Sequence, residues 1–279
     1  MTRTMTWIDA AGGETNISDG SAGITLLDNP VGLEVPTPTN NIDEYAAFDG
    51  GVIINRRRPV RQIALAVYIE HATRVETMIE QVASMFQGPG QLRWTDGLQS
   101  RTLKQVIYEG GLDGSGIFTL RERVPVISLL ALDPWWYGAQ QSTVIPFAAP
   151  TSFDAALAFS SLFPFDGGGS VAVPIDGDGD VWPTFTVTGP ETTLTIGSGG
   201  ITWQLAAPLA AGHTIVVDHR PGSRGPSLDG APIDWSLLTE ASRLFALAAG
   251  TGTSVIIGAS GTTGASTVTM TWEPRHLTP

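Results

Sequence analysis

Only one segment of this chain has the periodicity of an amphipathic helix, and that isolation constrains the fold more than any other feature. Apolar residues recur at helical spacing from Val75 to Phe86. Thr73 and Glu76 have the spacing of a capping box, and Gly88 is suited to a left-handed stop. The whole chain of 279 residues contains 33 glycines and 19 prolines, and these residues interrupt the segments outside the helix. The sequence therefore predicts a mainly β protein with one helix.

Strands in the first half are marked by alternation and by turn residues. In residues 61–70 every second side chain is a large aliphatic one, which is typical of a strand with one face in the core. Asp96-Gly97 suits a two-residue hairpin turn between segments 91–95 and 98–103. The stretch 124–138 is apolar until an Asp-Pro pair, because proline has no N–H to give to a sheet. It predicts the closing strand of a first domain, a β barrel or sandwich spanning 1–138.

The second half begins with a change in composition. Residues 139–170 form a Phe-rich arm that ends in a glycine-rich linker. The arm is too apolar for a solvated linker, so we expect it to pack against a domain or a neighbouring subunit. From 171 to 279 the chain has at least six short alternating runs separated by turn residues. This pattern predicts a second domain that is an antiparallel sandwich of jelly-roll type.

Composition excludes several classes of function. The formal net charge is −12, and a uniformly acidic surface repels a phosphate backbone, so we expect no specific nucleic-acid binding. The absence of cysteine excludes disulfides, thiol nucleophiles and cysteine-ligated metals. No stretch approaches the roughly 18 apolar residues that a membrane helix needs, and we expect a soluble protein with no membrane insertion.

Three alternating acids offer a weak candidate metal site. Asp176, Asp178 and Asp180 resemble the start of a calcium loop, in which carboxylates alternate with small residues. Val181 stands where the turn glycine of that loop belongs, and Val187 where its bidentate glutamate belongs. A solvated turn and a weak cation site both remain open.

Signatures of catalysis are missing from the sequence. No serine lies in a Gly-x-Ser-x-Gly motif, and no glycine-rich phosphate loop is followed by a lysine. We therefore predict no enzyme activity, no catalytic residues and no cofactor. The histidines make no metal-ligand spacing with one another, and we expect them at the surface or as caps. They are His71, His213, His219 and His276.

Arg56, Arg57 and Arg58, together with Arg61, form the one basic cluster in this acidic chain. Such a cluster can bind phosphate or nucleic acid. Arginines that lead into a strand more often pair with acidic neighbours or with another subunit. The cluster is therefore a candidate subunit interface, with intramolecular pairing as the alternative.

Tryptophans of the second domain allow two interpretations. Trp203, Trp235 and Trp272 lie in or near its predicted strands. Aromatic rings on a sandwich can stack on sugars, and this interpretation makes Trp203 and Trp235 candidate glycan contacts. Trp203 and Trp272 also belong to alternating runs of the kind that fill a core, so core packing is the competing interpretation.

The order and spacing of these motifs resemble the distal tail proteins of long, non-contractile-tailed bacteriophages, which are often called minor tail proteins. In the first half the matching residues are Gly32-Leu33-Glu34-Val35-Pro36, Asp49-Gly50-Gly51, Arg57 to Ile69, the single helix, Leu92 to Gly97 and Leu132 to Gly138. In the second half they are Gly179-Asp180, Pro183, Gly189, Gly212 to Asp218, Leu247, Gly250 and Thr271 to Arg275.

The resemblance implies a mainly β fold, with an N-terminal split β-barrel carrying one α-helix and a C-terminal galectin-like sandwich. It implies a structural hub at the distal end of the virion tail, assembled in the host cytoplasm, whose barrels close into a homohexameric ring. Its implied partners are the tail tube protein, the tape-measure protein, and a tail-tip hub or receptor-binding protein. The central channel would pass the tape-measure protein and then DNA. The family has no catalytic residues.

Two other classes of function compete with this interpretation. A carbohydrate-binding adhesion module is motivated by the predicted sandwich and its tryptophans. A tail-tip glycosidase or esterase is disfavoured because no nucleophile constellation is visible.

Overall fold

The computed structural model describes residues 3–27, 30–45, 49–112, 121–145, 168–263 and 265–279. The chain forms two compact units, Met1–Ala139 with His276–Pro279, and Gln140–Arg275. The sequence predicts a first domain that ends at Gly138 and a second that spans 171–279. The structure instead begins the second unit at Gln140 and groups the last four residues with the first unit. The five phenylalanines of the predicted arm lie between 147 and 165, outside the described residues.

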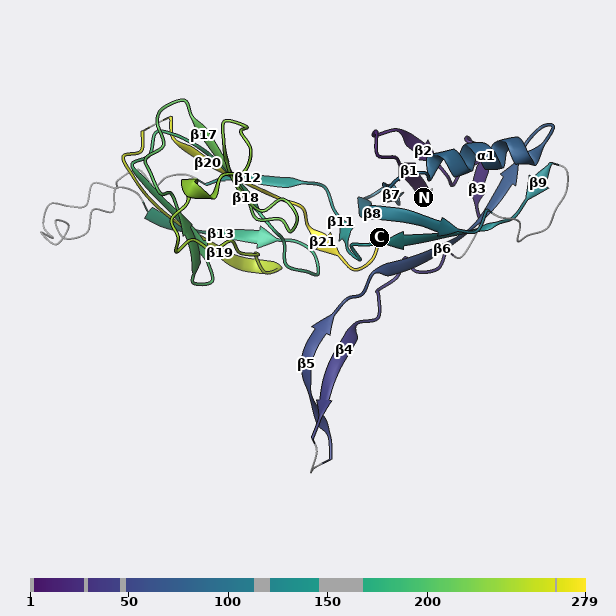
Figure 1. The fold of residues 1–279 in the computed structure, drawn as a ribbon, viewed down its shortest axis with the longest axis horizontal. Coiled ribbons are helices and arrows are strands. Elements are labelled where there is room, and N and C mark those ends of the chain that lie inside the picture. Colours follow the sequence, from purple (N-terminus) through teal and green to yellow (C-terminus); the bar gives the residue numbers. More distant parts are fainter. Residues whose placement is uncertain (1–2, 28–29, 46–48, 113–120, 146–167, 264) are drawn as a thin grey trace, which may run out of the picture. The chain divides into compact units, whose positions relative to one another are not determined.

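A curled antiparallel sheet makes up most of the first unit (Figure 1). Among the described residues it has ten strands, and its main path follows the order β2-β1-β7-β8-β10-β6-β3. The mainly β class and the split barrel with one helix are therefore confirmed. The strands of this sheet are β1 (Thr4–Ile8), β2 (Glu14–Asn16), β3 (Ile24–Leu26), β6 (Arg61–Glu70), β7 (Gly90–Thr95), β8 (Ser100–Gly110), β9 (Glu122–Arg123), β10 (Val126–Ala131), β11 (Trp136–Tyr137) and β21 (Arg275–His276).

Strand β6 has the predicted alternation. Ile63, Leu65, Val67 and Ile69 are all buried, and the residues between them are partly or fully exposed. The strand pairs with β10 along its first six residues and with β3 along its last part. Its apolar face therefore forms the centre of the core of the first unit.

The single helix, α1 (Val75–Met85), lies where the periodicity places it, but its predicted caps are wrong. Arg74 is the N-cap and makes no side-chain cap bond. Nδ1 of His71 instead accepts from the backbone N–H groups of Thr73 and Arg74, at 3.3 and 3.1 Å. The helix ends at Phe86, with φ of −98°, so no left-handed stop at Gly88 is used.

One aromatic contact fixes α1 to the sheet. The ring of Phe86 packs edge-on against Trp7 of β1, with centroids 4.6 Å apart. Nε1 of Trp7 donates to the carbonyl of Met85 at 2.9 Å, which satisfies one of the free carbonyls at the helix end. The indole therefore ties the last turn of the helix to the strand below it.

The predicted hairpin between β7 and β8 is present with a longer turn. Thr95 pairs with Ser100, so four residues form the loop instead of two. Oδ1 of Asp96 accepts from the N–H groups of Leu98 and Gln99, and Gly97 takes a φ of +85°. The aspartate side chain organises the wider turn, which removes the need for a two-residue geometry.

The stretch 124–138 takes a central position in the sheet and not the closing one that the sequence predicts. Its first part is β10, which lies between β8 and β6. The chain then turns at Asp133-Pro134 and continues as β11, which pairs with β8. The strand is central because it inserts between two strands that come earlier in the chain.

The second unit is a two-sheet antiparallel sandwich, as the alternating runs predict. Its described strands form one sheet in the order β12-β20-β14-β17-β18 and another in the order β13-β19-β15-β16. A single turn of 3-10 helix, η1, spans Trp235–Leu237. The strands are β12 (Gln141–Ile145), β13 (Gly168–Ile175), β14 (Thr184–Thr188), β15 (Thr193–Ser198), β16 (Ile201–Gln204), β17 (Thr214–Asp218), β18 (Gly225–Leu228), β19 (Gly250–Ser260) and β20 (Thr267–Trp272).

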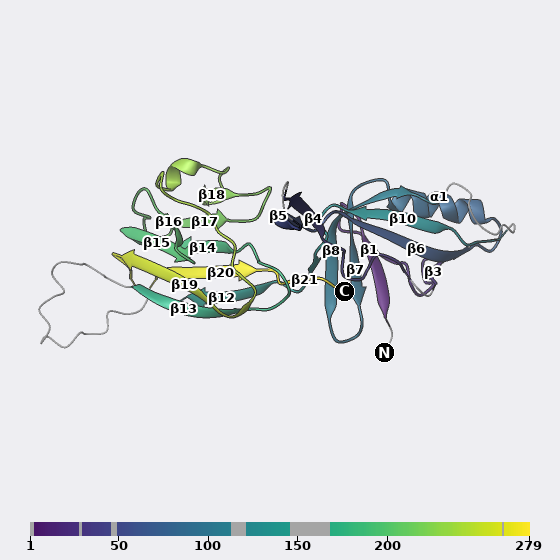
Figure 2. The same cartoon turned by 90° about the horizontal axis from the view of Figure 1, so that it is seen from below.

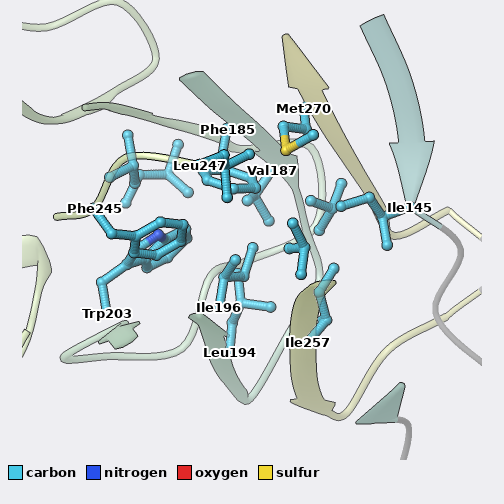
Figure 3. Packing of buried hydrophobic residues seen from close by; sticks show 14 of the residues in the cluster. Ile145, Phe185, Val187, Leu194, Ile196, Trp203, Phe245, Leu247, Ile257 and Met270 are labelled. Carbon is cyan, nitrogen blue, oxygen red and sulfur yellow. The ribbon is translucent and has the colours of Figure 1, made fainter. Parts of the chain in front are cut away.

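The core of this sandwich lies between the inner faces of the two sheets (Figure 3). In β20, Val268, Met270 and Trp272 point inward and are buried, while threonines occupy the positions between them. Phe185 of β14 meets Trp203 of β16 across the core, with ring centroids 5.9 Å apart. Alternation of β-branched polar residues with large apolar ones is what a half-buried strand requires.

A separate ribbon of two strands completes the first unit. Strands β4 (Thr39–Glu44) and β5 (Gly51–Arg57) pair only with each other among the described residues, and Figure 1 shows this hairpin projecting away from the main sheet. Every described residue of both strands is exposed. None of the helices in the described part of the chain is long and apolar enough to cross a membrane.

Candidate functional site

The basic cluster is divided by the structure into an exposed pair and an inward-facing pair. Arg56 and Arg57 lie at the exposed end of β5, and no ion pair of either is found among the described residues. Arg58 lies over the ring of Trp135, with its guanidinium carbon 4.8 Å from the ring centroid. Arg61 is 3% exposed at the start of β6. Of the four arginines, Arg56 and Arg57 are therefore the exposed ones.

Arg61 is bound within its own unit through backbone carbonyls. Nη1 donates to the carbonyl oxygens of Gly32, Leu33 and Glu34, at 3.0, 2.7 and 2.6 Å. Nε and Nη2 donate to Pro134, and Nη2 also donates to Leu277 at 3.0 Å. The intramolecular alternative is thus the one observed for Arg61, with carbonyls in place of carboxylates.

The charge of Arg61 persists despite its burial. Desolvation lowers the pKa of this guanidinium to about 10, and the nearby carboxylate of Glu34 opposes the shift. At neutral pH the group therefore remains charged and satisfied by carbonyl dipoles. Its role is to join three segments that are distant in sequence, which is structural.

The aromatic stretch after β10 is also structural. Oη of Tyr137 donates to Oδ2 of Asp133 at 2.6 Å, and Oδ1 of the same carboxylate accepts from the N–H of Trp135. Nζ of Lys104 lies 4.6 Å from the centroid of the Tyr137 ring. Trp136 is fully buried. These contacts fix the turn at Asp133-Pro134, so the three aromatics provide packing within the first unit.

The most unusual surface of the first unit is the β4–β5 hairpin. Ile42 and Ile53 are direct cross-strand partners, and antiparallel partners lie on the same face. A register shift next to this pair makes Ile54 the extra residue of a β-bulge, beside the other two. The three isoleucines are 55, 56 and 62% exposed. An isolated two-stranded ribbon is at best marginally stable in water. An exposed apolar cluster on such a ribbon is typical of a surface that binds another surface.

The hairpin also has its charges separated along its length. Asp43 and Glu44 lie on β4 near the loop end, and Arg56 and Arg57 lie at the opposite end of β5. The apolar cluster lies between the two charged ends. The hairpin therefore carries both signs of charge on one exposed surface, with the apolar cluster between them.

The three alternating acids of the second unit form a structural turn. Gly177 and Gly179 each make a bridge with Arg275, and the N–H of Asp178 donates to the carbonyl of Arg275 at 2.7 Å. Nη1 of Arg275 donates to the backbone carbonyl of Asp180 at 2.9 Å. Among the described residues, no group of three or more His, Cys, Asp or Glu side chains could hold a metal ion. Asp176, Asp178 and Asp180 therefore lie on a loop tied to Arg275.

The proposed glycan tryptophans do not form a platform. Trp203 is fully buried and cannot present a ring face, so for this residue core packing is the observed alternative. Trp235 lies in η1 and is 54% exposed. With one of its two rings inside the core, the predicted sugar-stacking pair is not available at the surface.

The structure places three of the four histidines in different surroundings. His71 caps the start of α1, and Nδ1 of His213 lies 2.6 Å from Oδ2 of Asp229 at the surface, as the sequence predicts. His219 is fully buried, and for this residue the surface prediction is wrong. Its Nδ1 lies 2.9 Å from the carbonyl oxygen of Phe245, and its ring packs edge-on against that phenylalanine. Burial lowers the pKa of His219 from 6.5 to about 4, so its imidazole is neutral.

A buried acid, Glu191, was not singled out from the sequence. It is 1% exposed, and neither carboxylate oxygen has a hydrogen-bond partner among the residues that the structure describes. Burial raises its pKa from 4.5 to about 7, because the charged form is poorly solvated there. Its backbone pairs with Leu209 in both directions, which fixes the residue in the sandwich. The sequence around Glu191 resembles an ordinary turn, so the burial of its carboxylate could not be predicted from the sequence.

Comparison with solved structures identifies this two-unit arrangement. Over 99% of both chains, the structure superposes on the Dit protein of SPP1, described as a paradigm of the hub adsorption apparatus in phages that infect Gram-positive bacteria, with a TM-score of 0.72 and 15% sequence identity. The chain has the fold of a phage Dit protein. The resemblance drawn from the sequence is thus confirmed at the level of the fold.

A second likeness is to a chain of the phage P2 baseplate in its activated conformation with calcium. It covers 100% of both chains at a TM-score of 0.56 and 10% identity. A strontium form of the same baseplate gives a TM-score of 0.52 at 10% identity. No family profile matches the sequence, and no curated protein is detectably similar to it. These similar structures are phage tail hub and baseplate proteins, and none of them is presented as an enzyme.

Proposed function

We propose that this protein is a structural hub of a phage tail tip, and that copies of it close into a ring through the β4–β5 hairpin. The fold shared with the Dit protein of SPP1 and with a chain of the P2 baseplate supports the hub role. The observation that carries the ring is the apolar cluster of Ile42, Ile53 and Ile54 on an isolated, exposed ribbon.

The hairpin has the properties of a subunit interface. Its three isoleucines are the kind of apolar core that such interfaces bury, and its arginines are enriched in interfaces of this kind. Arg56 and Arg57 have no ion pair among the described residues, while Asp43 and Glu44 lie at the other end of the same ribbon. A neighbouring copy that receives the hairpin would cover the cluster and supply opposite charges. If the neighbour receives the hairpin on a different surface, the contact is head-to-tail, and it closes into a ring when its rotation is favourable.

The finer assignments follow from the same proposal. The ring is a homohexamer at the distal end of the tail, and it joins the tail tube protein to a receptor-binding or tail-tip hub protein. The second unit is a galectin-like sandwich that contacts these tip proteins. The central channel passes the tape-measure protein and later DNA, and the net charge of −12 favours passage of DNA without adhesion. The role is structural and not enzymatic.

Native mass spectrometry and sedimentation of the full chain test the ring. We expect a discrete oligomer of six copies at micromolar concentration, with annular particles in negative stain. Replacement of Ile42, Ile53 and Ile54 by threonine should leave the fold intact, because all three side chains are exposed, and should shift the protein to monomers.

A matched control replaces three exposed apolar residues outside the hairpin. Leu98, Val144 and Ile256 are 79, 62 and 52% exposed, and their threonine variants should assemble as the parent does. The ring proposal fails if the parent is monomeric at all concentrations, including in the presence of purified tail tubes. It also fails if the hairpin variant and the control variant assemble equally well.

A further inference from the structure

The two sides of the sandwich in the second unit differ in how their edge strands are covered. At one side, β16 and β18 are covered by the segment from 229 to 243 (Figure 2). The N–H of Ala206 donates to Leu237, and the N–H of Thr239 donates to Gln204. On β18, the carbonyl of Pro226 accepts from Asp234. Covering an edge in this way is how sheet proteins protect unpaired backbone groups.

In the part of the chain that the structure describes, the other side of the sandwich is open. Strands β12 and β13 are the outer strands of the two sheets, and neither has a second strand partner among the described residues. A cleft of about 460 Å³ lies between them, lined by residues of both strands and by Trp272 of β20. Small-molecule clefts in proteins typically have volumes of about 300 to 1,000 Å³. The volume of the hollow falls in this range, and the hollow is open to solvent.

Strand register explains why this edge does not close. Gln141 pairs with Trp272 and Thr143 pairs with Met270, and both partners point into the core. Direct antiparallel partners share a face, so Gln141 and Thr143 also point inward. A closed sandwich edge would have apolar residues at these two positions. Ile145, the next inward residue of β12, is such a residue and is buried.

The cleft combines polar groups with an apolar wall. Nε2 of Gln141 donates to Oδ2 of Asp176 at 3.2 Å, which links the two strands across the opening. Val171 and Val173 of β13 and the edge of the Trp272 indole contribute apolar surface. Trp272 is 6% exposed, and its Nε1 has no hydrogen-bond partner among the described residues. The site therefore offers an amide, a carboxylate and hydroxyls opposite aliphatic and aromatic carbon.

We propose that this cleft binds a neutral saccharide. Sugar hydroxyls both donate and accept, and the amide of Gln141, the hydroxyl of Thr143 and the carboxylate of Asp176 complement them. The C–H face of a sugar ring complements the valines and the indole. Asp176 is the only charged residue that lines the described cleft, and its negative charge disfavours an anionic sugar.

An added peptide strand fits the same opening less well. Strand β13 contains Pro174, which has no N–H to donate, and its register shifts between Val173 and Ile175. The remaining edge, β12, is only five residues long. The polar groups that point into the cleft would be left without partners by an apolar peptide side chain.

This saccharide site is independent of the ring and of the earlier tryptophan pair. It uses neither Trp203 nor Trp235, and it lies entirely within the second unit. A monomeric hairpin variant should therefore bind the saccharide as the parent does. Loss of ring formation and loss of saccharide binding are distinguishable outcomes.

The test uses the full chain labelled with ¹⁵N, titrated separately with glucose, galactose, N-acetylglucosamine, rhamnose and their oligosaccharides, and with galacturonic acid as the anionic counterpart. We expect at least one neutral sugar to shift the amide resonances of 141–143 and 171–176. The acid should bind more weakly. Asp176→Asn and Thr143→Val should each weaken binding by about tenfold, as expected when one hydrogen bond in the complex is lost or weakened.

Trp235→Ala is the matched control, because it removes an exposed ring elsewhere on the same unit, and it should leave the affinity unchanged. The saccharide site is refuted if no neutral sugar shifts the resonances of the cleft, or if the shifted resonances lie elsewhere. Binding that is unaffected by both Asp176→Asn and Thr143→Val, or that is tighter for galacturonic acid, also refutes it. Selective binding of an extended peptide at the same residues would overturn the ligand class.

Discussion

Arg61 and Trp136 donate hydrogen bonds to the same acceptor, the backbone carbonyl of Leu33. The distances to this oxygen are 2.7 Å from Nη1 of Arg61 and 3.3 Å from Nε1 of Trp136. All three residues are buried. The segment around Leu33 has few ladder bonds of its own, apart from a bridge between Val31 and Ala64. The two donors therefore fix this segment against β6 and β11.

Replacement of Arg61 by leucine should destabilise the first unit strongly. The change removes the Arg61 donor from five buried or partly buried carbonyls, and Leu33 keeps a second donor in Trp136. One hydrogen bond from a charged donor typically contributes about 1.5 to 3 kcal/mol, so the loss should be at least of this size. Lysine should rescue only part of this loss, because one ammonium group cannot reproduce the planar fork of the guanidinium. Urea unfolding followed by tryptophan fluorescence measures both variants.

Arg56→Leu is the control for that experiment. Arg56 is exposed on the hairpin, and the structure shows no ion pair for it among the described residues. Below the concentration at which the ring forms, its unfolding free energy should stay within about 0.5 kcal/mol of the parent. Equal destabilisation by Arg56→Leu and Arg61→Leu would contradict the structural role assigned to Arg61.

Deletion of residues 276–279 should destabilise the first unit, although these residues come last in the chain. Nη2 of Arg61 donates to the carbonyl of Leu277, and Nη1 of Arg101 donates to that of Thr278 at 2.8 Å. The loss of two hydrogen bonds from charged donors predicts a decrease of about 2 to 4 kcal/mol in the unfolding free energy. Chemical unfolding of the truncated and full chains measures it. An unchanged urea midpoint would show that water replaces these carbonyl acceptors without loss of stability.

The elements with local periodicity could be predicted from the sequence, and the contacts that join distant segments could not. Strand β6 and helix α1 follow from spacings of two and 3.6 residues, which are visible within one window. The partners of Arg61 lie 28 residues away at Leu33 and 216 residues away at Leu277, and no local pattern reports them. The same limit applies to Gln141, whose inward direction depends on pairing with Trp272.

The exposure of an apolar strand could not be predicted from the sequence either. The run from Val52 to Ile54 has the composition of a core strand, yet its described residues are 47 to 62% exposed. Composition reports that a segment prefers burial, and it does not report which surface provides that burial. If the ring forms, these residues become buried in the assembly, and the sequence pattern is then consistent with the whole particle.

The pH dependence of the second unit should include a contribution from His219 that favours neutral pH. Its folded pKa, about 4, lies below the ordinary value of 6.5, because the buried ring resists protonation. The unfolded chain therefore takes up a proton first as pH falls from 6.5 towards 4, and stability is lost in that interval. The loss is on the order of 3 kcal/mol if His219 alone titrates. His219→Gln should flatten this slope in urea unfolding.

Glu191 should act in the opposite direction over an overlapping interval. Its folded pKa, about 7, lies above the ordinary value of 4.5, so the folded protein retains a proton that the unfolded chain has released. The stability that this proton provides is complete below pH 4.5 and is lost as pH rises through 7. Between pH 4.5 and 6.5 the contributions of Glu191 and His219 therefore oppose each other, and the parent protein should show a shallow pH profile.

Glu191→Gln separates the two contributions. The amide cannot ionise, so the variant should gain stability relative to the parent at pH 8 and little at pH 5. With the opposing group removed, the decrease caused by His219 on acidification should become steeper than in the parent. Glu240→Gln, at an exposed position, is the matched control and should leave the profile unchanged. Urea unfolding at intervals between pH 4.5 and 8 measures all three proteins. If the unfolding free energies of Glu191→Gln and of the parent change with pH in parallel, Glu191 is ionised in the folded protein.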